Sequence, residues 1–130
     1  MKKLIAILGA SLFMATAAFA ADPVEGIWKT EVDDGSYAHI TMAPCGAKLC
    51  GVISRTFKDS GEYQSENIGK TLVINMAPDG VNFYRGNVWR PSNDKIYIGK
   101  IDLDGDTLYL KGCVAGGLLC SKQTWSRVIE

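Results

Sequence analysis

Apolar and polar residues alternate with a period of two in several stretches of the chain. Ala38, Ile40 and Met42 occupy every second position of one such stretch, and Leu72 and Ile74 do the same in another. Successive side chains of a β-strand point to opposite faces, so this alternation predicts strands with one face turned to a core. Apolar residues fall on both parities in 81–90 and 95–104. These two strands are expected to be apolar on both faces.

Turn signals rich in glycine, proline, asparagine and aspartate separate short segments rich in β-branched and aromatic residues. The predicted strands are 24–31, 36–43, 49–57, 71–77, 81–90, 95–104, 107–113 and 120–128. Pro44, Pro78 and Pro91 all fall between them, where a missing N–H removes no ladder hydrogen bond. Segment 58–70 is predicted to be a long loop with a helical turn as an option, serving either as a binding loop or as a solvated connection.

Short links between consecutive strands favour an antiparallel meander, and eight such strands can close into a barrel without exposed edges. The sequence therefore predicts an all-β, eight-stranded antiparallel up-and-down barrel, with a two-sheet sandwich as the alternative. Closure would bring Trp28, in the first predicted strand, against Trp125 in the last. Arg127 shares a face with Trp125, and its guanidinium is expected to cover an indole and seal one end of the barrel. A barrel of this size is either filled by side chains or holds one small ligand.

The first twenty residues have the pattern of a secretory signal peptide. Lys2 and Lys3 precede an apolar run over 4–13, and the Ala-Phe-Ala sequence ending at Ala20 fits a cleavage site. A transmembrane anchor is the weaker alternative, because the run is shorter than the ~20 residues of a bilayer span. We expect cleavage after Ala20, a single domain over 21–130 with no integral membrane span, and a periplasmic or secreted location.

The charge balance of the sequence argues against nucleic acid and a membrane surface as partners. The chain has 14 basic and 14 acidic residues, and cleavage would remove two lysines and leave 12 basic residues. This near-neutral balance gives no basic footprint for nucleic acid. No polybasic stretch of the sequence indicates a membrane surface.

All four cysteines, Cys45, Cys50, Cys113 and Cys120, lie beyond the predicted cleavage site. In an oxidising compartment an even cysteine count is interpreted first as disulfides, and four cysteines allow three pairings. Each local pair spans one turn between predicted strands, which favours Cys45–Cys50 and Cys113–Cys120. The rival is a zinc site, but neither spacing has the tight knuckle of structural zinc motifs.

The sequence contains no recognisable catalytic set. His39 is the only histidine, and its parity points it away from Ile40 and toward solvent. Without it no Ser/His/Asp arrangement can be assembled. The acidic run over 102–106 resembles the start of a calcium loop, but its glycine comes too early, and Asp104-Gly105 is a strong hairpin signal. We expect no enzymatic activity, no metal and no cofactor.

Aromatic residues gather in the predicted strands 81–90 and 95–104, with arginines between them. One interpretation is cross-strand packing in the core. The other is a pocket with aromatic walls and a cationic group that orients a small, partly apolar ligand. The candidate ligand-binding residues are Phe83, Tyr84, Arg85, Trp89 and Tyr97. An alternative function is a protein-interaction or envelope-stress module that offers an exposed aromatic face of these strands to an envelope protein partner.

Three motifs carry a family resemblance. They are Asp-Pro-Val-Glu-Gly-Ile-Trp at 22–28, Ala-Pro-Cys-Gly-Ala-Lys-Leu-Cys-Gly at 43–51, and the segment 111–127, which ends in Thr-Trp-Ser-Arg. Together they resemble the DUF2147 family of exported bacterial proteins over essentially the whole mature chain. The resemblance implies a small lipocalin-like β-barrel in the periplasm or outside the cell, and it implies no established activity. Gly26-Ile27-Trp28 and the last-strand Arg127 also resemble the G-x-W and arginine of calycin barrels.

Overall fold

The computed structural model describes residues 21–129, so the predicted signal peptide lies outside the described range. The elements in chain order are β1 Gly26–Lys29, β2 Ser36–Cys45, β3 Lys48–Lys58, β4 Gly61–Tyr63, β5 Thr71–Pro78, β6 Phe83–Arg90, β7 Lys95–Asp104, β8 Thr107–Val114, the 3-10 turn η1 Ala115–Gly117, and β9 Leu119–Arg127. Apart from β4 and η1, they match the eight predicted strands to within a few residues. In this range no helix has the length and apolar character needed to cross a bilayer.

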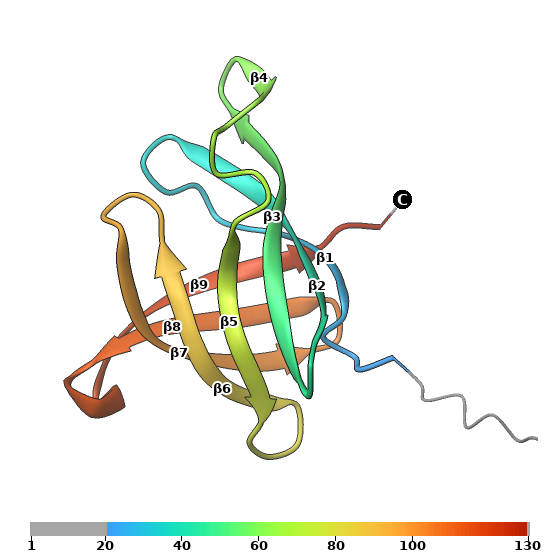
Figure 1. The fold of residues 1–130 in the computed structure, drawn as a ribbon, viewed down its shortest axis with the longest axis vertical. Coiled ribbons are helices and arrows are strands. Elements are labelled where there is room, and N and C mark those ends of the chain that lie inside the picture. Colours follow the sequence, from blue (N-terminus) through green and yellow to red (C-terminus); the bar gives the residue numbers. More distant parts are fainter. Residues whose placement is uncertain (1–20, 130) are drawn as a thin grey trace, which may run out of the picture.

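The strands close into an antiparallel barrel (Figure 1). Pairing runs in the order β1, β9, β8, β7, β6, β5, β3 and β2, and β2 pairs with β1 as well as with β3. Eight strands therefore form the wall, and β4 adds only to the end of β3. The prediction of an eight-stranded antiparallel barrel is confirmed.

The segment 58–70, predicted to be a loop, contains the short strand β4. Gly61 has a φ of +117°, which permits the chain to reverse and pair Phe57 with Glu62. The hydroxyl of Thr56 donates to the carbonyl of Tyr63 at 2.5 Å. A three-residue strand is too short to show a period of two, so the sequence carried no signal for it.

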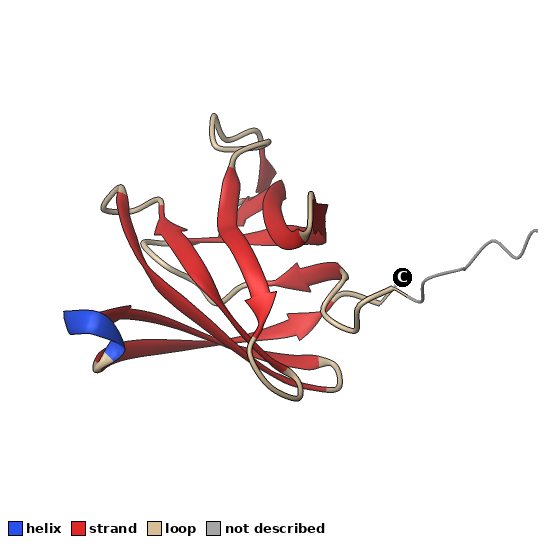
Figure 2. Cartoon of the chain, turned by 60° about the horizontal axis from the view of Figure 1, so that its bottom comes forward, coloured by secondary structure: helices blue, strands red, loops and turns tan. Residues whose placement is uncertain are grey.

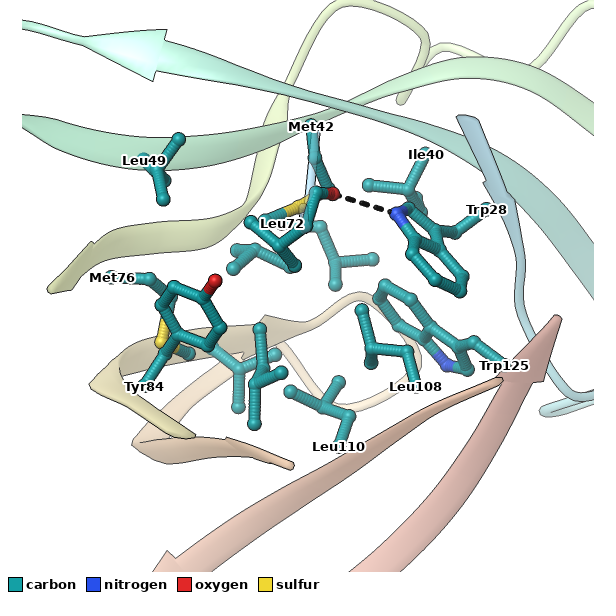
Figure 3. Packing of buried hydrophobic residues seen from close by; sticks show 14 of the residues in the cluster. Trp28, Ile40, Met42, Leu49, Leu72, Met76, Tyr84, Leu108, Leu110 and Trp125 are labelled. Atoms are coloured by element: carbon teal, nitrogen blue, oxygen red, sulfur yellow. Dashed lines mark hydrogen bonds between the residues drawn. The ribbon is translucent and has the colours of Figure 1, made fainter. Parts of the chain in front are cut away.

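Two indoles and one guanidinium seal the seam between β1 and β9. Trp28 and Trp125 are fully buried and lie next to one another in Figure 3. The Arg127 guanidinium lies 4.3 Å from the ring centroid of Trp28. It also donates to the carbonyls of Glu25 and Pro23, at 2.8 and 2.7 Å, and Nε reaches Asp106 at 2.8 Å. The guanidinium thus satisfies backbone groups while it covers an aromatic face.

The core fills the interior behind this seam, and close packing requires glycine at several strand positions, of which Gly51 is an example. A Cβ on Gly51 would lie 2.6 Å from Met42 Sδ and 2.7 Å from Ile40 Cγ2. At the end of the barrel where β6 begins, the buried Tyr84 donates its hydroxyl proton to the carboxylate of Asp22. Burial, followed by that hydrogen bond and the charge of Asp22, raises the pKa of the Tyr84 phenol.

Both predicted disulfides are confirmed. Cys45–Cys50 closes the β2–β3 hairpin, and Cys113–Cys120 joins residues directly opposite one another on β8 and β9. No cysteine of the described range is free, so the zinc alternative is wrong. Figure 2 shows η1 at the outer tip of the β8–β9 hairpin, where Gly116 and Gly117 both take positive φ values.

Truncation of Trp28 tests the seam. Trp28→Ala should lower the free energy of unfolding by about 3–5 kcal/mol, since the indole is fully buried and also carries Arg127. Urea unfolding followed by far-UV circular dichroism measures the change. Trp89→Ala is the control, because Trp89 is half-buried and its loss should cost about 1 kcal/mol. Equal effects of the two substitutions would contradict this account of the seam.

Reduction tests the disulfides. Each closes a short loop, with sequence separations of 5 and 7, and should stabilise the fold by about 2 kcal/mol. Reducing both should lower Tm by roughly 15–30 °C, while the barrel stays folded at ambient temperature on its packed core. Thermal melts with and without reductant measure this. Loss of the fold at 25 °C on reduction would show that the core is weaker than its packing implies.

Candidate functional site

A cavity of about 330 Å³ opens at the end of the barrel opposite Tyr84. Its lining comes from the link between β1 and β2, the start of β2, the segment after β4, the turn between β6 and β7, and the inner faces of β8 and β9. Ligand pockets usually measure roughly 300–1,000 Å³. The cavity is therefore suited to one small molecule.

The floor of the cavity is apolar. Trp125, Leu110 and Val88 are buried core residues that also line it. Gly112 contributes room, because it stands on the inner side of β8 without a side chain. A Cβ placed there would meet Tyr97 and Val88 at 3.6 Å, which is ordinary contact. The apolar floor is thus continuous with the core.

Polar side chains surround the upper part of the cavity and hold one another. Gln123 accepts a hydrogen bond from the Trp125 indole N–H at 2.8 Å. The hydroxyls of Ser36 and Tyr63 lie 3.2 Å apart, and Asn93 donates to the Tyr97 hydroxyl at 2.7 Å. These bonds orient the rim side chains without a bound molecule.

One ion pair spans the mouth. Arg90 at the end of β6 donates from Nε and Nη2 to the two carboxylate oxygens of Asp33, both at 2.9 Å. Ser92 adds a third bond to Asp33 at 3.2 Å. Hydrogen bonding to Arg90 holds the pKa of Asp33 below its ordinary value, and the same bond raises the pKa of Arg90. This forked geometry is the stronger form of a charged hydrogen bond.

The structure places only two of the five predicted ligand-binding residues at the cavity. Trp89 and Tyr97 line the cavity, whereas Phe83, Tyr84 and Arg85 do not. β6 separates them, because it begins at the closed end with Phe83 and Tyr84 and reaches the mouth at Trp89 and Arg90. The aromatic residues of β6 and β7 are half-buried or buried. These two strands therefore present no fully exposed aromatic side chain to a protein partner.

Sequence reasoning missed Asp33, Ser36, Tyr63 and Gln123 as cavity residues. Arg90 is one of the arginines that lie among the aromatic residues of 81–90, but no sequence signal links it to Asp33, from which it is separated by 57 positions. Barrel closure alone brings the two residues together.

The residues that line the cavity do not form a recognisable catalytic triad or a metal site within 21–129. No group of three or more histidine, cysteine, aspartate or glutamate side chains within 21–129 is placed to hold a metal ion. His39 does not line the cavity, and its ring lies 4.7 Å from that of Phe57 on β3. The arrangement has a shape and a polar rim suited to binding a small molecule.

Comparison with known proteins agrees with this architecture. The protein HP1028 from Helicobacter pylori, described as belonging to the lipocalin family, superimposes with a TM-score of 0.63 at 13% identity over 82% of this chain and 84% of that one. No curated protein matches the sequence. The profile of a family described as an uncharacterised protein conserved in bacteria, DUF2147, matches residues 26–127. The chain therefore belongs to the DUF2147 family, and its fold is a lipocalin-like barrel.

Proposed function

We propose that this protein is a non-enzymatic carrier that binds one small, partly apolar molecule in the cavity at the barrel mouth. The observation that carries the proposal is a cavity with an apolar floor formed by core residues and a polar rim. An apolar part of the ligand would lie against Trp125 and Leu110. A polar end would remain at the mouth, near Arg90 and Tyr97.

The residues around the cavity support binding more than catalysis. Its two carboxylates already accept hydrogen bonds, Asp33 from Arg90 and Glu31 from the backbone N–H of Thr124. A general base needs a partner whose proton it can take. A rim whose polar groups are already paired is suited to orienting a ligand.

We also infer that the protein works in the periplasm or outside the cell. The signal-like pattern of 1–20 and the two disulfides support this location, because disulfides persist in oxidising compartments. The ligand would then be a molecule of the cell envelope or its surroundings. The domain that binds it would be residues 21–130.

Filling the cavity tests the carrier role. Gly112→Leu places a side chain in the cavity from a position where a Cβ is tolerated. Decanoate and decanol are suitable probes, and their binding is measured by the fluorescence of the tryptophans at the cavity and by calorimetry. We expect at least a tenfold loss of affinity, equivalent to about 1.4 kcal/mol. Thr124→Leu, on the exposed side of β9, is the control. Equal binding by both variants, or no binding of either probe to the unaltered protein, would contradict the proposal.

The ion pair at the mouth gives a second test. Asp33→Asn removes the carboxylate that engages Arg90, so decanoate should bind more tightly than it does to the unaltered protein, while decanol should not change. Arg90→Gln should abolish this preference for the acid. A similar gain for decanol in Asp33→Asn would show that the pair acts only as a steric barrier.

The Asp33–Arg90 pair should also make the free energy of unfolding depend on pH. The pKa of Asp33 lies below its ordinary value of 3.8, so the folded state favours the carboxylate. Its contribution to stability is complete above the unfolded pKa and is lost as pH falls through the folded pKa. The difference in unfolding free energy between the unaltered protein and Asp33→Asn should stay constant from pH 5 to pH 7. It should shrink at more acidic pH. Denaturant titrations at several pH values measure it.

A further inference from the structure

Four basic residues form one row across the outside of the barrel. Arg85 on β6 is paired directly with Lys100 on β7, Lys100 with Lys111 on β8, and Lys111 with Lys122 on β9. Neighbouring strands lie about 4.8 Å apart, so the row extends over roughly 14 Å. We name these four residues the basic row.

Two members of the basic row make contacts with uncharged groups, because Lys122 Nζ lies 5.1 Å from the Tyr109 ring centroid and Lys100 donates to the carbonyl of Gly117. Like charges directly opposite one another on neighbouring strands destabilise a sheet. None of the four makes an ion pair with another residue of 21–129, whose ion pairs belong to Arg55, Arg90 and Arg127. The nearest acidic side chain of the same strand face, Asp102, stands two positions from Lys100 and opposite Tyr109. The row is thus a local positive surface on a protein of near-zero net charge.

An exposed apolar tip stands beside the basic row. The β8–β9 hairpin extends past the row and ends in η1 (Figure 2). Its tip exposes Leu118 at 84%, Leu119 at 66% and Val114 at 49% of their surfaces. Lys100 donates to the carbonyl of Gly117 at 3.1 Å, which fixes the tip against the row. The Cys113–Cys120 disulfide closes the hairpin between the row and the tip.

We propose that this surface docks on an anionic phospholipid bilayer. Lysine and arginine side chains are attracted to anionic headgroups, and exposed leucines partition into the boundary between headgroups and acyl chains. A soluble polyanion would engage the basic row but would leave the leucines in water. The combination of a cationic row with a rigid apolar tip therefore favours a lipid surface. The basic row is on the outside of the barrel, whereas β8 and β9 line the cavity from their inner faces with Gly112 and Ser121.

Vesicle co-sedimentation tests the proposal. The exported protein, with loss of residues 1–20 checked by mass, is mixed at low ionic strength with vesicles of phosphatidylcholine alone or with 30% phosphatidylglycerol. We expect binding to the anionic vesicles only. Each lysine near such a surface strengthens binding about fivefold, so Lys111→Gln/Lys122→Gln should weaken partitioning roughly 25-fold.

The matched control is Lys48→Gln/Lys95→Gln, which removes the same charge from two exposed lysines outside the row. It should weaken partitioning far less. Leu118→Ser/Leu119→Ser should reduce vesicle binding but leave binding to polyphosphate unchanged. Circular dichroism checks that each variant is folded. No preference for anionic vesicles, equal losses in the two lysine pairs, or full vesicle binding by the leucine variant would overturn the proposal. Binding to polyphosphate without vesicle binding would also overturn it and assign the row to a soluble polyanion.

Discussion

The structure depends on the seam where the first strand meets the last. β1 has four residues, and only Trp28 and Lys29 pair with β9. So short a ladder supplies few backbone hydrogen bonds to close a sheet of eight strands. Side chains supply the rest, because Arg127 lies over the Trp28 ring and bonds the carbonyls that precede β1. The barrel is closed as much by one guanidinium and two buried indoles as by strand pairing.

The packing behind this seal also determines where the interior of the barrel has room. Bulky side chains fill the interior from the seam to Tyr84, which leaves space only toward the opposite end. There Gly112 has no side chain and Trp125 ends the packed region. The same indole therefore belongs to the core on one side and to the cavity floor on the other. The packed core and the cavity share this boundary at Trp125, whereas Arg90 and Asp33 lie at the mouth, outside the packed core.

The register of the strands fixes which residues are neighbours on the outside of the barrel as well as in its interior. Residues separated by 11 to 15 positions in sequence, such as Arg85 and Lys100 or Lys111 and Lys122, become direct neighbours because antiparallel register aligns them. The chain has no polybasic stretch, and its charge balance gave no indication of a positive surface. Charge statistics along a chain describe local runs, but a sheet assembles charges perpendicular to its strands.

Strand positions, the closed all-β architecture and both disulfides could be predicted from the sequence, because alternation, turn residues and short cysteine loops are local signals. Trp89 and Tyr97 were also identified as candidate ligand contacts, and both line the cavity. Phe83, Tyr84 and Arg85 lie on the same strand as Trp89, and no sequence signal distinguished them from it. The end of the barrel that each position faces depends on register and closure. The Asp33–Arg90 pair, the open mouth and the basic row result from contacts between distant strands, which exist only after the barrel has closed.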